Sequence, residues 1–392
     1  MGGLTARPVP PHVARVVVAV FITLPSILSS VSAGVIRVGA AEAVRSVAEA
    51  ARIARDGDVV EIEAGDYLGD VAVWARRTLT IRGIGGRPRL IASGASAEGK
   101  AIFVIRGGRV SVENVAFLGA RVPHRNGAGI RLEAGSLVVR DCLFEDNESG
   151  MLVSNDPSIE LEVHNSEFGR NGAGDGQSHH LYAGWIGKLV VRGSYFHHGN
   201  AGHLLKSGAR ENFILYNRIT DEIGGRASYE LEFFSGGIAF VIGNLIEQAS
   251  TTQNSVMVSF GAAGYRWPRN ELNLAHNTLV NDRTNGGIFV RVHAGSAAVR
   301  AVNNLLVGEG SLQLNVPHES TNNVRAEWGD FALPQRFDYR LKGRSRLAGR
   351  AKDPGTADSI SLRPNAEYAH PARAIDLGSG TGLSPGAFQS HP

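Results

Sequence analysis

Cysteine is almost absent from this chain: Cys142 is the only one among 392 residues. No intrachain disulfide can form, so stability in an oxidising compartment has to come from a packed core. Cys142 follows Asp141 among apolar positions, where a buried, unreactive thiol is expected rather than a nucleophile.

Charge of one sign is also scarce. Lysine and arginine together number 40, and aspartate and glutamate 37, which gives a formal net charge of +3. A surface that binds a polyanion would therefore be a local patch and not the whole protein. Nothing in the composition points to nucleic acid as a partner.

Long hydrophobic runs are missing except near the N-terminus, where one spans residues 16–28. Basic residues precede this run and small residues follow it up to Ala33, which is typical of a cleaved export signal. The run is too short for a membrane-spanning helix. We therefore predict that residues 1–33 are a signal peptide and that the mature protein is periplasmic or secreted, without membrane attachment.

Glycine is abundant, with 49 residues, and this suits short strands joined by tight turns. A short phrase also recurs, in which an alternating apolar strand is followed by Asn or a substitute. The eight copies end at Asn114, Asp141, Asn165, Gly193, Asn217, Asn244, Asn277 and Asn304. Successive copies are 27, 24, 28, 24, 27, 33 and 27 residues apart, and a repeat in this range indicates stacked supersecondary units. The Asn column is predicted to be structural, because Asn tolerates left-handed turns and stacked amides can hydrogen-bond between coils.

The repeat predicts an all-β solenoid that forms one domain over residues 34–392. A second family of apolar strands runs between the copies, and the period leaves room for three short strands in each coil. Apolar residues at helical spacing predict a capping helix within residues 34–57. Residues 58–310 are predicted to form the coils, and residues 311–392 irregular C-terminal coils and a cover.

Several segments carry a resemblance to a known family across nearly the whole mature chain. They are the amphipathic helix, Asp56-Gly57-Asp58-Val59-Val60, Ala64-Gly65-Asp66-Tyr67, the Asn-marked coils and Tyr339-Arg340-Leu341. With these segments the chain resembles the pectate-lyase-like superfamily, which implies a right-handed parallel β-helix. That superfamily includes lyases, hydrolases, epimerases and adhesins, so the resemblance implies less about function.

Ionisable side chains replace the usual Gly, Ser or Val on three successive coils between Asp175 and Glu232. Equivalent positions of stacked coils lie about 4.8 Å apart. Alignment of the three strands puts His180, His203 and Tyr229 in one column. Lys206 and Glu232 fall in a neighbouring column. A catalytic or substrate-binding patch is expected here, and a purely structural hydrogen-bonded ladder is the alternative.

β-Elimination from a uronate polymer suits these residue types. It needs positive charge at the C6 carboxylate, a base for the C5 proton and an acid for the leaving oxygen. The segment Gly202-His203-Leu204-Leu205-Lys206-Ser207 resembles the alginate- and chondroitin-lyase branch of these β-helix proteins, which implies that Lys206 is the base. That branch has Arg, then His and Gly, on the following coil, where this chain has Glu230-Leu231-Glu232-Phe233.

This departure leaves the other roles open. His180, His203 and Tyr229 are candidates for binding the carboxylate or moving protons, with Tyr229 or His203 as the acid. Arg210 and Arg226 are candidates for supplying positive charge.

Glu230 and Glu232 are two residues apart on a strand, so they are expected to point to the same side, about 6.6 Å apart. Three interpretations fit that geometry. The pair could bind Ca²⁺ that bridges the uronate, form the acid and base of an inverting glycosidase, or hold Lys206 and a nearby Arg in ion pairs.

Further aromatic and basic residues are expected to line a substrate groove. Tyr182 and Trp185 lie on the first of the three coils, and Arg266 and Trp267 lie in the insert that lengthens one step to 33 residues. Trp267 could stack on a sugar ring and Arg266 could bind a carboxylate, although a loop anchored by one buried Trp is an equal alternative. Arg291, on the coil beyond, could extend the basic groove.

Together these features predict an exported, monomeric polysaccharide lyase that acts on an acidic, uronate-containing polysaccharide. Two alternatives stay open: a uronate C5-epimerase or glycoside hydrolase on the same fold, and a non-catalytic carbohydrate-binding surface protein.

Overall fold

The computed structural model describes residues 1–3, 33–295, 297–378 and 382–390. The predicted signal peptide thus lies almost entirely outside the described residues. Residues 33–392 form one compact unit. None of the helices in the described part of the chain has the length and apolar character needed to span a bilayer.

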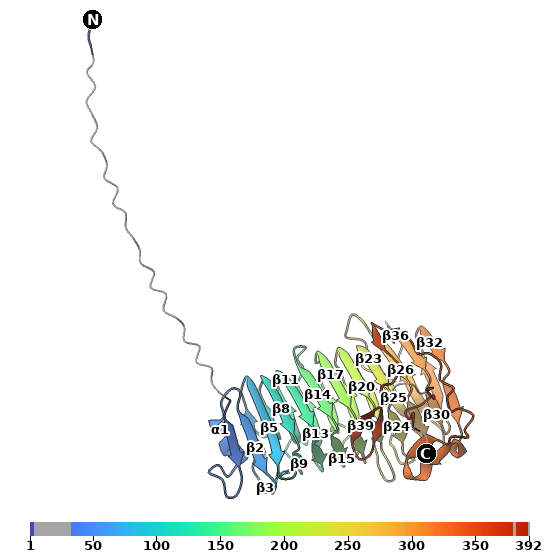
Figure 1. The fold of residues 1–392 in the computed structure, drawn as a ribbon, viewed down its shortest axis with the longest axis horizontal. Coiled ribbons are helices and arrows are strands. Elements are labelled where there is room, and N and C mark those ends of the chain that lie inside the picture. The colour runs from blue at the N-terminus through green and yellow to red at the C-terminus, as the bar shows by residue number, and fades with distance from the viewer. Residues whose placement is uncertain (4–32, 296, 379–381, 391–392) are drawn as a thin grey trace. The chain divides into compact units, whose positions relative to one another are not determined.

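Short parallel strands build three long sheets, here called A, B and C, and each coil of the chain adds one strand to each sheet in turn (Figure 1). Sheet A contains β1 (Val35–Val38), β2 (Val59–Glu63), β5 (Thr78–Ile84), β8 (Arg109–Glu113), β11 (Ser136–Arg140), β14 (Glu160–His164), β17 (Lys188–Arg192), β20 (Glu211–Leu215), β23 (Ile238–Ile242), β26 (Glu271–Ala275), β29 (Ala298–Val302) and β32 (His318–Thr321). Sheet B contains β3 (Asp66–Leu68), β6 (Arg89–Ile91), β9 (Ala116–Leu118), β12 (Leu143–Glu145), β15 (Glu167–Gly169), β18 (Tyr195–His197), β21 (Arg218–Thr220), β24 (Leu245–Gln248), β27 (Thr278–Asn281), β30 (Leu305–Val307) and β33 (Val324–Ala326).

Sheet C contains β4 (Ala72–Trp74), β7 (Ala101–Ile105), β10 (Ala128–Leu132), β13 (Ser149–Val153), β16 (Leu181–Ala183), β19 (Leu205–Ser207), β22 (Leu231–Phe233), β25 (Val256–Phe260), β28 (Ile288–Val292) and β31 (Ser311–Leu314). The architecture is the right-handed parallel β-helix that the sequence predicts. Each strand can bury only one face, so stacking of coils is what closes the core.

The predicted capping helix is α1 (Val47–Ile53), which packs on β4 and β1 at the N-terminal end of the stack (Figure 1). The hydroxyl of Ser46 accepts a hydrogen bond from the amide of Glu49, which satisfies one of the free amides of the first turn. The carboxylate of Asp70 accepts two more, from Val47 and Ala48. These bonds fix α1 over the first coil, where core and strand edges would otherwise be exposed.

Aromatic side chains continue the stack inside the core. Phe117, Phe144, Phe168 and Phe196 occupy one register column of sheet B, and their ring centroids are 4.6–5.1 Å apart. Each such pair contributes about 0.5–1.5 kcal/mol of stability beyond the contribution from burying the area of the rings. The core therefore has its own coil-to-coil periodicity.

The predicted single Asn column proves to be two adjacent columns. Sheet A pairs Arg192 with Leu215, so Gly193 aligns with Tyr216, and Asn217 aligns with the residue after Gly193. The first column has positive φ throughout, and Asn114 (φ 54°) is one of its members. The second column begins with small buried side chains and continues as a ladder of amides: Asn217, Asn244, Asn277, Asn304 and Asn323. Left-handed turns and amide stacking thus belong to neighbouring positions.

Cys142 belongs to the second column, where it follows Val115 of the preceding coil. Its side chain is 1% exposed, and its amide donates a hydrogen bond to the hydroxyl of Ser166 on the next coil. Burial raises the pKa of the thiol to about 12. The prediction of a buried cysteine is confirmed.

The residues after β33 fold back along the outside of the stack. Their elements are η1 (Trp328–Asp330), β34 (Phe331–Leu333), η2 (Pro334–Arg336), β35 (Asp338–Leu341), β36 (Thr356–Ala357), β37 (Ile360–Ser361), β38 (Ala366–Ala369) and β39 (Arg373–Asp376). The hydroxyl of Tyr216 donates to the side-chain carbonyl of Asn365, at 2.9 Å, and the ring of His276 contacts the carbonyl of Ser384. This C-terminal segment covers the positive-φ column and part of sheet B.

Replacement of Asn244 by Ala is expected to destabilise the protein. The Asn244 side chain is fully buried, accepts from Asn217 and donates to Ile214 and Asn277. Each buried partner left without a hydrogen bond costs about 1–3 kcal/mol, so the midpoint of thermal unfolding should fall by several degrees. The control is Asn126→Ala, at an exposed position with no hydrogen bond to a described residue. Equal midpoints for the two variants would contradict a stabilising ladder.

Candidate active site

Three outward-facing side chains lie in one register column on sheet C. Tyr182 on β16 pairs with Lys206 on β19, and Lys206 pairs with Glu232 on β22. Each of these strands has three residues, with buried neighbours on either side of the central one. The strand alternation therefore turns the central side chain outward.

A second column lies at the turn that leads into these strands. The ring of His203 is 4.6 Å from the ring of His179 and 4.9 Å from that of Tyr229, centroid to centroid. His203 and Tyr229 thus lie together, as the sequence predicts. The member from the first coil is His179, and the prediction of His180 for this place is wrong by one residue.

His180 points into the interior instead. It is 1% exposed, and its Nε2 lies 2.8 Å from the carbonyl oxygen of His197. Burial lowers its pKa to about 3, so the ring is neutral. The strand begins only at Leu181, so His180 belongs to the preceding turn. Side chains in the turn do not alternate as they do on a strand, and His180 therefore points inward although Tyr182 points outward.

The carboxylate of Glu232 joins the two columns. Its Oε2 lies 3.0 Å from Nδ1 of His203 and 3.3 Å from Nζ of Lys206. The contact with His203 is close enough for an ion pair but poorly aligned for a hydrogen bond. Burial acts to raise the pKa of Glu232, yet His203 and Lys206 outweigh it and the pKa lies below its ordinary value. Glu232 is therefore ionised at neutral pH.

The two histidines are held in the neutral form. Burial lowers the pKa of His203, and the contact with Glu232 offsets this only in part. Burial lowers the pKa of His179 well below its ordinary value, and the proximity of His203 and Lys206 acts in the same direction. Nδ1 of His179 accepts a hydrogen bond from the amide of His203, at 3.0 Å, so the proton of the neutral ring is on Nε2.

Glu230 lies in a different environment from Glu232, and the prediction that both point to one side is wrong. Glu230 precedes β22 and is fully buried, with Gln248 as its hydrogen-bond donor at 3.5 Å. Burial, together with the charges of Asp221 and Glu247, raises its pKa well above the ordinary value, so the side chain is protonated. The two glutamates do not fit as joint ligands of Ca²⁺. Among the described residues, no group of three or more His, Cys, Asp or Glu is placed to hold a metal ion.

An aromatic wall borders Lys206. The ammonium of Lys206 lies 5.5 Å from the ring centroid of Phe234, and that ring stacks at 5.9 Å on Tyr182. Sequence reasoning missed Phe234 and His179, although both directly adjoin residues that it named. The indole of Trp185 donates to the hydroxyl of Ser235, at 3.0 Å, and extends the wall.

The long insert folds back onto this wall. The amide of Arg266 donates to the carbonyl of Ser235, and the indole of Trp267 donates to the carbonyl of Gly208, each at 3.0 Å. The guanidinium of Arg266 lies 4.1 Å from the ring centroid of Trp185. The predicted groove residues of the insert are therefore close to the first coil of the site.

Three of the predicted cations lie apart from this cluster. Arg210 is 3.6 Å from Glu211, and Arg226 donates to the side chain of Asn200. Arg291 shares the register column of Glu232 but lies two coils further on, where its Nε donates to the side-chain oxygen Oε1 of Gln313 at 3.0 Å. Their partners on the chain are thus other polar side chains and not His203 or Glu232.

The three-sheet coil described above is that of a right-handed parallel β-helix. The crystal structure of pectate lyase Pel9A is similar to this chain, with a TM-score of 0.56 and 14% sequence identity over 92% of this chain and 97% of that one. No family model and no curated protein matches the sequence. At this identity the likeness to the lyase establishes the shared fold.

Glu230→Gln and Glu232→Gln are expected to change stability in opposite directions. A raised pKa at Glu230 means that the native protein loses stability as the pH rises above the ordinary value of 4.5, by up to about 1.4 kcal/mol per pH unit. Glutamine removes this loss, so Glu230→Gln should be more stable at pH 8. A lowered pKa at Glu232 contributes stability above pH 4.5 that is lost as the pH falls.

Glu232→Gln should therefore be less stable than the native protein at pH 7, and the difference should shrink towards pH 4. Thermal unfolding midpoints between pH 4 and pH 9 measure both effects. The same pH dependence in both variants would contradict the two assigned charge states.

Proposed function

We propose that the protein is a polysaccharide lyase that cleaves an acidic, uronate-containing polysaccharide by β-elimination. One observation carries the proposal: a neutral histidine and an ion-paired lysine contact a single ionised carboxylate on the outward face of sheet C, and a tyrosine packs against that histidine. The aromatic wall beside them offers faces on which sugar rings stack.

Lys206 supplies the positive charge for the C6 carboxylate of the sugar. Its side chain is 23% exposed, and its ammonium is 3.3 Å from Glu232. The geometry therefore favours Lys206 as the cation and moves the role of base, which the family resemblance implies for Lys206, to a neighbour.

His203 is the base. Its Nδ1 faces Glu232, and its Nε2 makes no hydrogen bond within the described part of the chain. The pKa of His203 is lowered by burial, so the ring is free to accept a proton at neutral pH. Glu232 then stabilises the imidazolium, as the acidic partner of histidine does in other dyads and triads. His179 donates a hydrogen bond from its Nε2–H to the C6 carboxylate of the sugar, where negative charge develops.

Tyr229 is the acid. Its ring packs edge-on against His203, so the base and the acid approach the sugar from the same side. The C5 proton moves to Nε2 of His203, and the C5–H electron pair forms the C4–C5 double bond. The C4–O bond breaks, its electron pair goes to the leaving oxygen, and Tyr229 protonates that oxygen. Tyr182, whose pKa is raised by burial and by Glu232, stays neutral and serves as a binding surface.

A uronate C5-epimerase would use the same base and cation but return the proton to the other face of C5. It would exchange the C5 hydrogen with solvent without forming an unsaturated product. A non-catalytic saccharide-binding protein would do neither. The hydrolase alternative built on Glu230 and Glu232 loses its support, because the two carboxyl groups lie on different sides of the strand. The signal-like N-terminal sequence supports action outside the cytoplasm.

The pH profile of kcat/KM is expected to identify the base. With His203 as base, activity should fall only below pH 6.5, because burial lowers the pKa of His203 from that value. The measurement is ultraviolet absorbance of the unsaturated product on a panel of uronate polymers, with and without a chelator. Full activity of His203→Ala would contradict the assignment.

Tyr229→Phe and Tyr182→Phe form a matched pair. Loss of the acid at Tyr229 should lower kcat by about 100-fold or more, while Tyr182→Phe should mainly raise KM because only a binding contact changes. Steady-state kinetics on the same polymer measures both constants. A larger loss of kcat in Tyr182→Phe than in Tyr229→Phe would reverse the two roles.

A further inference from the structure

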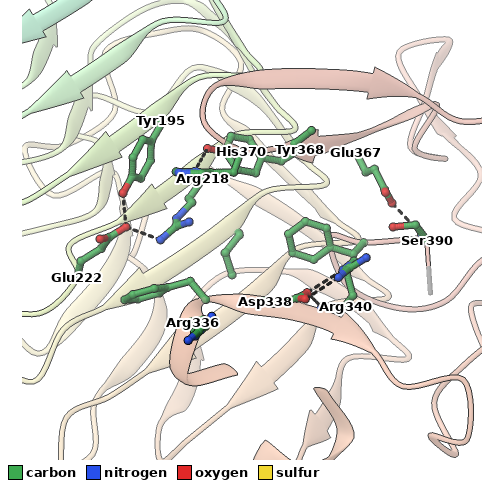
Figure 2. Close-up of a pocket in the computed structure, with 14 residues that line it drawn as sticks. Tyr195, Arg218, Glu222, Arg336, Asp338, Arg340, Glu367, Tyr368, His370 and Ser390 are labelled. Atoms are coloured by element: carbon green, nitrogen blue, oxygen red, sulfur yellow. Dashed lines mark hydrogen bonds and ion pairs between the residues drawn. The ribbon is translucent and has the colours of Figure 1, made fainter. Parts of the chain in front are cut away.

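A second cavity lies outside sheet B, on another side of the coils from the proposed active site. Its volume is about 530 Å³, and it lies between the strands β18, β21 and β24 and the C-terminal segment that covers them (Figure 2). Tyr195, Arg218 and Leu245 are register partners on these three strands and form one wall. Residues of η2, β35 and β38 form the opposite wall.

Arg218 is a fixed positive group in this cavity. Its guanidinium lies 4.8 Å from the ring centroid of Tyr195 and 4.6 Å from that of Phe337, so it is held between two rings. Its Nε donates to the hydroxyl of Thr220, at 3.0 Å, and its Nη2 donates to Glu222. Glu222 also accepts from the hydroxyl of Tyr195. Arg218 is thus locked on one side, and its Nη1 has no hydrogen bond within the described chain.

The other two carboxylates of the cavity are also occupied. Asp338 receives two hydrogen bonds from Arg340, at 2.8 and 2.7 Å. Glu367 accepts from the amides of Gln389 and Ser390, at 2.6 and 2.9 Å. Every acidic side chain on the cavity wall therefore has a donor on the chain itself.

Arg336 is the exception among the charged groups. It ends η2, is exposed, and forms no ion pair or hydrogen bond with any described residue. Figure 2 shows it at the cavity, across the open space from Arg218. A cavity in which the acidic groups are satisfied and guanidinium donors remain is suited to an anion, because guanidinium binds a planar carboxylate with two parallel hydrogen bonds.

We propose that this cavity is a second site for an acidic sugar, and that it binds one or two uronate rings through a carboxylate held by Arg336 and Arg218. The volume of about 530 Å³ falls in the range of about 300–1,000 Å³ that is common for small-molecule sites. Phe337 and Tyr368 supply apolar surface for the ring, and His370 supplies a polar edge. The choice of a uronate as the sugar rests on the proposed function.

The test measures, by calorimetry, the binding of a uronate disaccharide to the full chain carrying Lys206→Ala. This exchange removes the proposed cation of the active site on sheet C. We expect binding to persist in this background. A further Arg336→Ala exchange should weaken it about tenfold or more, the typical effect of losing a charged hydrogen-bonded pair. The affinity of Arg336→Lys should lie between the two, because lysine keeps the positive charge but cannot donate two parallel hydrogen bonds to a carboxylate. The matched control is Arg344→Ala, an exposed arginine of the same segment that does not line the cavity.

Three outcomes would overturn the proposal. Undiminished binding in Arg336→Ala with an unchanged unfolding midpoint would remove the role of Arg336. Equal binding of the uncharged disaccharide would remove the role of the carboxylate, and equally strong competition by inorganic phosphate would replace the sugar by any small anion. Binding to this cavity without lyase activity in the native protein would refute the proposed function and leave the second site standing.

Discussion

The residue-by-residue register between successive coils is the constraint on which the rest of the structure depends. It places Tyr182, Lys206 and Glu232 on one face although 24 to 50 residues separate them in the chain. A slip of one residue would turn each side chain to the opposite face. The buried amide ladder around Asn244 opposes such a slip, because each amide in it bonds the equivalent amide of the next coil and a slip would break that bond. The ladder has no chemistry of its own, yet the site exists only while it holds the register.

Glu230 and Glu232 are only two residues apart in the chain, yet their surroundings give them different charge states. Glu232 faces two positive or hydrogen-bonding partners and is ionised, whereas Glu230 faces buried acids and is protonated. At the start of β22, Glu232 is thus an anion on the outward face, and Glu230 is a neutral side chain in the core. This division suits the proposed chemistry, since a second negative charge beside Lys206 would compete with the sugar carboxylate for the ammonium.

The fold and the location of the candidate site could be predicted from the sequence, because both follow from a repeat that is visible in one dimension. The orientation of single side chains could not. His179 and His180 are adjacent, and only the start of β16 at Leu181 decides which of them faces His203. Phe234 carries no polar signal that would mark it as part of a site. The cavity outside sheet B was beyond sequence reasoning, since its two walls come from segments that are at least 91 residues apart, the separation of Leu245 and Arg336.

The C-terminal segment explains why the outer faces of sheet B and sheet C differ in the size of ligand that fits them. Over sheet B it adds a second wall and encloses a space of limited volume, which suits a short ligand. The contacts described for this segment run to sheets A and B, so the outward column of sheet C continues from Tyr182 to Arg291 over four coil steps. At about 4.8 Å per step this column is roughly 19 Å long, which is longer than one sugar ring. The lengths of the two faces thus agree with the two proposals, a polymer at the face with the proposed base and cation and a short acidic sugar in the enclosed cavity.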